Sequence, residues 1–93
     1  MAEKTDTPRD GRLLDEGMSA SRLEEWFVRE VLPLEAALMQ FLKHNWHNKS
    51  DIADLRQEVY QRVCEASQTQ LPDQAKAFVF RTARNLLIDR IRR

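Results

Sequence analysis

The 93-residue sequence is poor in the residues that build disulfide-linked, glycine-rich or membrane-spanning proteins. It has one cysteine, Cys64, so no disulfide can form within the chain, and this favours a reducing, intracellular compartment. Its two glycines both lie before residue 20, which leaves no glycine-rich phosphate-binding loop. No stretch approaches ~18 consecutive apolar residues, and the N-terminus lacks the apolar segment of a secretory signal. We therefore expect a cytoplasmic protein that does not insert into a membrane.

The sequence also lacks net charge, but its charges are unevenly distributed. Residues 76–93 carry six basic residues and one acidic residue, a net charge of +5. Residues 1–75 carry nine basic and fourteen acidic residues, a net charge of −5. This division suggests an acidic body with a basic arm for a polyanion, and a solvated basic end of a helix is the simpler alternative.

The N-terminal part divides into a leader and a helical region. Residues 1–20 are polar, and we expect them to form a disordered leader before a single domain at residues 21–93. Apolar residues recur at helical spacing over residues 21–44, with Ser21 as the expected N-cap. Pro33 lies inside this run, so we expect a kink or break there and two helices in place of one.

Two further helices are expected, over about residues 51–66 and 74–92, joined by a polar loop. Ser50 or Asp51 should cap the first of them, and Asp73 the second. The expected core residues are Ile52, Leu55, Val59 and Val63 in the first helix and Phe80, Ala83, Leu87 and Ile91 in the second, with Val79 on the flank. No strand signal is present. The predicted fold class is all-α, a small bundle of three to four helices.

Candidate catalytic and metal-binding groups are sparse. His44 and His47 form one closely spaced pair, whereas a zinc site needs about four ligands. The carboxylates of Asp51, Asp54 and Glu58 lie on one helix, but no Glu-x-x-His accompanies them as a di-iron bundle requires. Cys64 has no histidine or asparagine arranged to activate it as a nucleophile. We expect no metal, no cofactor and no enzyme activity.

Two helix faces carry the informative polar residues. The 51–66 helix has a stripe of acceptors and amides suited to a basic partner helix, and an ordinary solvated surface is the alternative. Its members are Asp54, Gln57, Glu58 and Gln61. The last helix places Arg81, Asn85 and Arg92 on one side, with Asp89 and Phe78 beside them. Arginine suits phosphate, and asparagine can pair with an adenine edge. Phe78 fits stacking on a base and core packing equally well, whereas Phe80 fits the core better.

Two segments resemble those of a known family. Residues 54–60, DLRQEVY, resemble the D-L-x-Q-E-x-F signature of region 2.2 in bacterial RNA polymerase sigma factors. Residues 80–93 are similar to regions 2.3 to 2.4 of the extracytoplasmic-function (ECF) group, where the pattern reads roughly F-R-x-A-R-N-x-x-I-D-x-x-R-R. The AFVFRTARN form looks like the iron-starvation subgroup. The resemblance covers about residues 25–93. The chain departs from it at Phe78, where many members have tryptophan, and at Ala53, where glutamate is usual.

The resemblance implies a non-catalytic specificity subunit of the RNA polymerase holoenzyme. Asp54, Gln57, Glu58 and Gln61 would dock on the coiled-coil clamp of the largest polymerase subunit. The last helix and the loop at residues 67–74 would recognise the melted −10 promoter element on its non-template strand and hold a flipped base. The implied DNA-binding residues are Phe78, Arg81, Arg84, Asn85, Asp89, Arg92 and Arg93.

The resemblance also bears on partners and on the extent of the chain. An anti-sigma factor is an expected second partner, because members of the family are commonly held inactive by one. Members continue into a region 4 that reads the −35 element, and this chain ends at Arg93, so we expect region 2 alone. A helical protein-interaction module with no nucleic-acid role is the alternative function. A duplex-reading helix-turn-helix ranks last, because the 67–73 loop is too long for it.

Overall fold

The computed structural model describes residues 20–92, and every regular element within that range is helical. The all-α prediction is therefore confirmed. The predicted leader lies outside the described residues except for Ala20, which begins the first helix. In chain order the elements are α1 (Ala20–Trp26), η2 (Phe27–Val31), η3 (Leu32–Leu34), α2 (Glu35–Asn45), η4 (Lys49–Asp51), α3 (Ile52–Ala66) and α4 (Ala75–Arg92).

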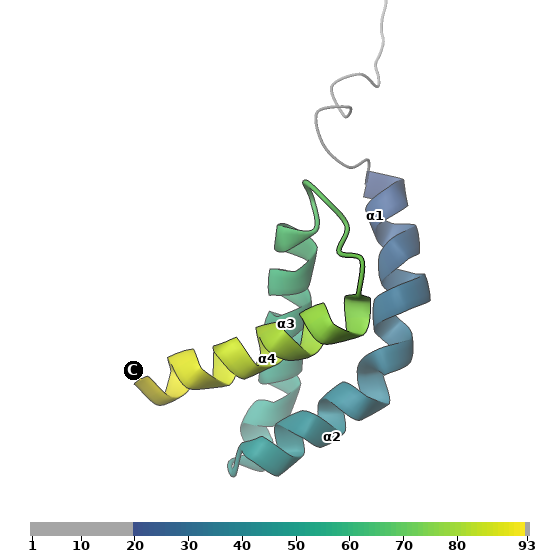
Figure 1. Ribbon diagram of the computed structural model, residues 1–93. Coiled ribbons are helices and arrows are strands. Elements are labelled where there is room, and N and C mark those ends of the chain that lie inside the picture. The colour runs from purple at the N-terminus through teal and green to yellow at the C-terminus, as the bar shows by residue number, and fades with distance from the viewer. Residues whose placement is uncertain (1–19, 93) are drawn as a thin grey trace, which may run out of the picture.

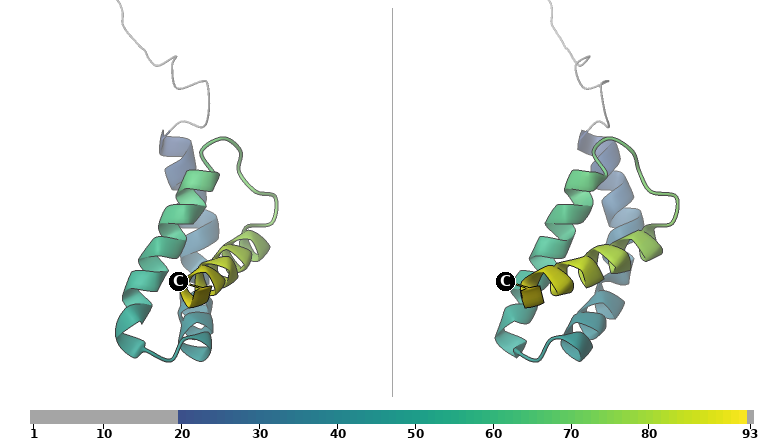
Figure 2. Two further views of the ribbon diagram at one scale, coloured as in Figure 1. Left: turned by 90° about the vertical axis from the view of Figure 1, so that its left-hand side faces the viewer. Right: turned by 60° about the vertical axis from the view of Figure 1, so that its left-hand side comes forward.

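The helices form a bent rod, an upright helix beside it and a third helix laid across both (Figure 1). The rod consists of α1 and α2 and their connection, and α3 runs back alongside it (Figures 1 and 2). The last helix, α4, packs on α3, on η2 and on α2, and its C-terminal end extends past α3. Because α2 also packs directly on α3, each of the three layers contacts the other two.

The rod bends where the sequence predicts a break at Pro33, and the break is longer than expected. A π-helical turn covers Phe27–Val31, in which the backbone N–H of Leu32 donates to the carbonyl of Phe27. A 3₁₀ turn that contains Pro33 follows it. Proline has no backbone N–H, so the regular α-helical bonding pattern cannot continue through this segment. The bend turns α2 under α4 (Figure 1).

The hydrophobic core lies where the three layers meet. The predicted α3 stripe is confirmed, since Ile52, Leu55, Val59 and Val63 are all buried. In α4 the prediction holds for Ala83 and Leu87, holds in part for Phe80, which is half-buried against the core, and fails for Ile91, which is 72% exposed. Ile91 belongs to the last turn of α4, and the C-terminal end of that helix extends past α3 (Figure 1). Val79 and Leu86, which were not assigned to the core, are completely buried.

The helix ends differ in detail from the predicted caps. Ser21 lies inside α1, so it is not the N-cap. The side chain of Asn48 caps the η4 turn by accepting from the backbone N–H of Ser50 at 3.1 Å. Asp51 occupies the N-cap position of α3, but its carboxylate accepts from the indole Nε1 of Trp46 at 3.0 Å. The turn between α2 and α3 is thereby held by side-chain bonds within it.

The start of α2 is tied to α3 by the only tyrosine of the chain. The hydroxyl of Tyr60 donates to Glu35 Oε1 at 2.7 Å, and Arg56 Nη1 lies 3.5 Å from Glu35 Oε2. The ring of Phe27 meets the ring of Tyr60 edge to face, with centroids 5.1 Å apart. Burial, and then the hydrogen bond to Glu35, raises the pKa of Tyr60 above its ordinary value. The phenol is therefore held in its neutral, donating form.

The contact between α3 and α4 carries a network of alternating charges, here called the α3–α4 ion network. Arg90 of α4 bonds to Glu58 and lies 3.7 Å from Asp54, both on α3. Arg62 of α3 bonds to Glu58 at 3.4 Å and to Asp89 of α4 at 3.2 Å. The Arg90 and Glu58 side chains are only 22% and 30% exposed, so these bonds are partly shielded from water. The pairs of this network that join α3 to α4 link residues 27 to 36 positions apart in sequence.

Replacing Glu58 with glutamine should lower the free energy of unfolding at neutral pH by on the order of 1 kcal/mol, and this difference should shrink in acid. The hydrogen bond from Arg90 lowers the pKa of Glu58 below its ordinary value of 4.5. The stabilisation is therefore complete above the unfolded-state pKa and is lost as the pH falls through the lower folded-state pKa. Urea unfolding of both proteins, followed by circular dichroism from neutral pH to below about pH 4, measures the difference.

Glu65→Gln is the matched control, because Glu65 is an exposed glutamate on the same helix. It should change stability by less than about 0.5 kcal/mol at any pH. If the difference in free energy of unfolding between wild type and Glu58→Gln stays constant with pH, the network contributes no net electrostatic stability.

Candidate functional site

The outward stripe of α3 is formed by three of the four residues predicted to bind a partner. Asp54, Gln57 and Gln61 are exposed, and their spacing places them on one side of the helix. These three residues are here called the α3 polar face. The buried stripe of the same helix lies on its other side, so the core holds this face in a fixed direction. The face offers one carboxylate and two amides, which suits a partner rich in hydrogen-bond donors.

The fourth predicted residue, Glu58, is placed differently. It was expected at an exposed position, and this is wrong, because its side chain is 30% exposed and both carboxylate oxygens accept from arginines. Glu58 turns toward α4, where Arg90 and Arg62 meet it. Asp54 retains 78% side-chain exposure although it lies 3.7 Å from Arg90. Glu58 is thus a link between the two helices, while Asp54 remains available at the surface.

The outward side of α4 carries the residues predicted to bind DNA. Arg81, Arg84, Asn85 and Arg92 are all exposed, and Phe78 is half-buried beside them. These four exposed residues, together with Ile88, are here called the α4 basic face. Ile88 is 38% exposed among the basic side chains, and the sequence reasoning assigned it no role. Its exposure follows from its position between the arginines on the helix, one turn from Arg84 and one from Arg92. Arg93 lies outside the described residues.

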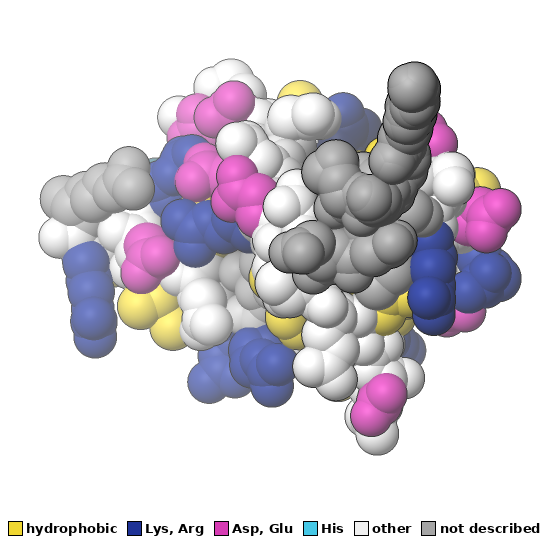
Figure 3. Space-filling model, turned by 90° about the horizontal axis from the view of Figure 1, so that it is seen from above, with side chains coloured by type: hydrophobic (Ala, Val, Ile, Leu, Met, Phe, Trp, Pro, Cys, Tyr) yellow, Lys and Arg dark blue, Asp and Glu magenta, His cyan; other side chains and the backbone are white. Residues whose placement is uncertain are grey.

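The basic residues of α4 divide into two groups. Arg90 forms ion pairs with Glu58 and Asp54, and Asp89 accepts from Arg62. The charges on this side of α4 are therefore paired with opposite charges on α3. Within residues 20–92, no ion pair joins Arg81, Arg84 or Arg92 to an acid. Figure 3 shows acidic and basic side chains interleaved over the upper part of the face in view and a group of basic side chains without acidic neighbours at its lower edge. The positive charge of α4 is therefore displayed outward.

Phe78 is positioned by contacts on both sides. Its ring packs against the core, and the guanidinium of Arg81 lies 5.9 Å from its centroid. A cation over an aromatic face is an attractive arrangement that also keeps the arginine over the ring. Phe78 is thus partly a core residue and partly a surface aromatic next to positive charge, which combines the two interpretations of it that the sequence left open.

The loop before α4 is anchored at its beginning and middle. Ser67 is completely buried, and its backbone N–H donates to the carbonyl of Val63 at 3.0 Å. Leu71 packs against the core, whereas residues 68–70 are exposed. Gln74 starts α4 by accepting from the backbone N–H of Phe78 at 3.0 Å, so Gln74 and not Asp73 occupies the N-cap position. The exposed part of the loop is short and fixed at both ends.

The described residues give little support to a metal site, a reactive cysteine or a membrane-spanning helix. Within residues 20–92, no group of three or more His, Cys, Asp or Glu lies close enough to hold a metal ion. Burial, with a smaller effect from Glu65, raises the pKa of the Cys64 thiol, which disfavours the reactive thiolate. In the same part of the chain, no helix has the length and apolar character needed to cross a membrane.

Comparison with known proteins identifies the family. A family model described as Sigma-70 region 2 matches residues 27–93, more than two thirds of the chain. No curated protein and no solved structure matches the sequence. Region 2 of sigma-70 proteins is a non-catalytic domain of transcription initiation factors that acts in RNA polymerase binding and promoter recognition. The matched residues begin at the π-helical turn and include both the α3 polar face and the α4 basic face. The chain therefore belongs to the sigma-70 family, and residues 27–93 are its region 2.

Proposed function

We propose that this domain docks on the coiled-coil clamp of the largest RNA polymerase subunit through the α3 polar face and recognises the unpaired −10 non-template strand through the α4 basic face. The observation that carries the proposal is the division of charge on α4. Arg90 is compensated by α3, whereas Arg81, Arg84 and Arg92 remain exposed around Asn85. A face of this kind suits a strand whose phosphates need several cations and whose bases offer directed hydrogen bonds.

The polymerase contact uses Asp54, Gln57 and Gln61. All three are exposed and rigidly held, because the opposite side of α3 lies in the core. Glu58 contributes by keeping α3 and α4 in register, since its carboxylate is occupied by Arg90 and Arg62. Ala53 is exposed where related domains carry a glutamate, so this docking surface has one acidic contact fewer.

The DNA contact assigns different roles to the residues of α4. Arg81, Arg84, Arg92 and Arg93 hold phosphates, and Asn85 reads a base edge. Phe78 presents the exposed part of its ring to a base beside Arg81, and Asp89 orients Arg62 at the border of the face. The loop at residues 67–74 forms a pocket for a flipped base. Opening a base from its stack costs a few kcal/mol, which the pocket and the phosphate contacts offset.

The sequence of α4 suggests a group within the sigma factors, and the two binding faces suggest a second protein partner. We assign the domain to the ECF group on the sequence of residues 80–93, and to an iron-starvation-like subgroup on its AFVFRTARN segment. An anti-sigma factor would inhibit the domain by covering the α3 polar face or the α4 basic face, since either contact is required for initiation. The proposed location of the protein is the bacterial cytoplasm, where RNA polymerase and promoter DNA are found.

Replacing Gln57 and Gln61 together with alanine should weaken docking on the clamp coiled coil by about 1–2 kcal/mol, roughly five- to thirtyfold. Both residues are exposed, so the fold should lose less than about 0.5 kcal/mol per substitution. Binding of the isolated coiled coil to both proteins, with circular dichroism to verify folding, is the measurement. Glu25→Ala, an exposed change on α1, is the control and should bind normally. Normal binding by the folded double variant would remove the docking proposal.

Replacing Asn85 should change sequence preference, whereas replacing Arg92 should weaken binding to every sequence. Loss of a base contact costs roughly 1–3 kcal/mol for the preferred strand and little for others. Loss of a phosphate contact reduces the slope of affinity against salt by about one unit. Non-template strands substituted at each −10 position are titrated against Asn85→Ala and Arg92→Ala, each bound to core polymerase, at several salt concentrations.

The two variants control for each other, because both residues are exposed on the same side of α4. Equal weakening of all strands by Asn85→Ala, with altered preference in Arg92→Ala, would reverse the assigned roles. Unchanged binding by both would mean that α4 is not the recognition element, and the protein-interaction alternative would then be favoured.

A further inference from the structure

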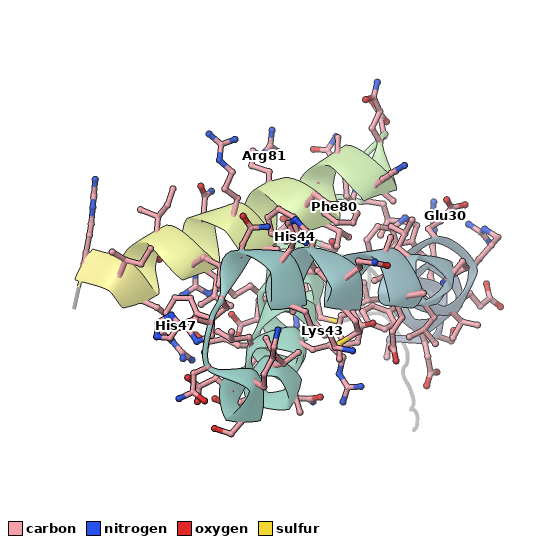
Figure 4. All side chains as sticks on the ribbon, turned by 90° about the horizontal axis from the view of Figure 1, so that it is seen from below. Glu30, Lys43, His44, His47, Phe80 and Arg81 are labelled. Atoms are coloured by element: carbon pink, nitrogen blue, oxygen red, sulfur yellow. The ribbon has the colours of Figure 1, made fainter. Side chains whose placement is uncertain are left out.

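A hollow lies between α2 and α4, outside every site that the sequence predicted. Its volume is about 450 Å³, and its lining consists of Ala37, Gln40, Phe41, His44, Asn45 and Phe80. Five of these residues come from α2 and only Phe80 from α4. Figure 4 shows Phe80 and His44 between the two helices, with Arg81 projecting outward from α4. The hollow exists because the bend before α2 turns that helix beneath α4 (Figure 1).

The hollow has an aromatic floor and a polar rim. The rings of Phe41 and Phe80 meet edge to face, with centroids 5.6 Å apart and an interplanar angle of 88°. Both residues are half-buried, so part of each ring remains accessible. Gln40, His44 and Asn45 are exposed at the rim. Asn45 Nδ2 donates to the carbonyl of Phe41 at 2.8 Å, and this leaves its Oδ1 able to accept from a ligand. Such a combination suits a small planar group with polar edges.

The surroundings of the hollow are basic. Arg81 directly follows Phe80, and Arg84 is exposed one turn further along α4. On its other side the hollow adjoins a second one, which shares Gln40 and His44 and is also lined by Lys43 and Lys49. In the described part of the chain, neither hollow is lined by an acidic residue. These basic residues lie beside the hollow and not in its lining, which suits a planar ligand whose negative charge lies outside its ring, as in a nucleotide within a strand.

We propose that this hollow holds one unpaired base of the DNA strand, with the base against Phe80 and Phe41 and the flanking phosphates at Arg81 and at Lys43. The inference rests on the proposed DNA contact and adds to it a subsite on α2, separate from the loop at residues 67–74. Gln40, His44 and Asn45 then meet the edge of the base. A protein segment is a poorer fit, because an apolar peptide would leave the lysines and arginines around the hollow without partners.

The test compares two identical substitutions in similar surroundings. Phe80→Leu keeps apolar volume and removes the stacking face. Phe27→Leu is the matched control, because Phe27 is also half-buried in an edge-to-face pair, with Tyr60, and lines a hollow that includes Glu24. Fluorescence anisotropy measures binding of the chain to labelled single strands of one mixed sequence, either intact or with a single abasic position placed at each site in turn. Phe80→Leu should weaken binding to the intact strand roughly five- to hundredfold, as loss of one stacked base does, and Phe27→Leu should not.

The abasic strands show whether a base is involved. With the base removed at the position that occupies the hollow, wild type should lose affinity to the level of Phe80→Leu, and the two proteins should bind that strand equally. His44→Ala provides a second variant, since His44 is exposed and its loss should not disturb folding. His44→Ala should bind the intact strand more weakly than wild type, by less than Phe80→Leu does, and should bind the strand without that base as wild type does. Thermal unfolding verifies the fold of each variant.

The outcomes separate this inference from the function on which it rests. If Arg81→Ala lowers affinity while Phe80→Leu and His44→Ala do not, the DNA contact stands and the base subsite is wrong. If Phe80→Leu weakens binding to the polymerase coiled coil and leaves strand binding intact, the hollow is a protein contact and the inference is overturned. If the wild-type chain binds no strand in a salt-dependent way, the proposed DNA contact fails and the subsite fails with it.

Discussion

The position of α4 across the bundle depends on Arg90. This guanidinium lies at the contact with α3, where it meets Glu58 and Asp54, and a second arginine, Arg62, joins Glu58 to Asp89. The apolar contacts of the buried α4 residues are non-directional, so they leave α4 more freedom to shift than directed bonds do. The directed, partly shielded bonds of the network restrict that freedom. The polar face of α3 and the basic face of α4 are therefore held at a defined angle.

The bend between α1 and α2 is the second feature that positions the helices. A straight helix from residue 20 to residue 45 would carry its second half away from α4. The π-helical turn and the 3₁₀ turn at Pro33 redirect it, and the ring of Phe41 in α2 then reaches Phe80. The tie from Tyr60 to Glu35 fixes the first turn of α2 after this bend. One local feature of the backbone thus determines which side chains of α2 share a surface with α4.

The features that could be predicted from the sequence are those determined locally. The apolar stripe of α3, the break at Pro33 and the outward arginines of α4 follow from spacing along one helix or from the chemistry of one residue. Glu58 was misjudged because its partner, Arg90, lies 32 positions away, and helical spacing does not reveal a contact between two helices. Ile91 was misjudged for a related reason: its periodicity is correct for a core residue, but α4 extends past the helix that would bury it. The hollow at Phe80 depends on the angle between α2 and α4, which no local pattern encodes.

The tie between Tyr60 and Glu35 has a practical consequence. Tyr60 is the only tyrosine in the chain, so its near-ultraviolet absorbance reports a single phenol. Burial and the bond to Glu35 raise its pKa, so the phenol ionises at a higher pH than a free tyrosine, and ionisation removes the proton that it donates to Glu35. Alkaline titration followed by absorbance consequently reads out the loss of this tie between the bent rod and α3, without a label and without altering any residue on either binding face. The spectroscopic signal originates at the joint that keeps the bend in place.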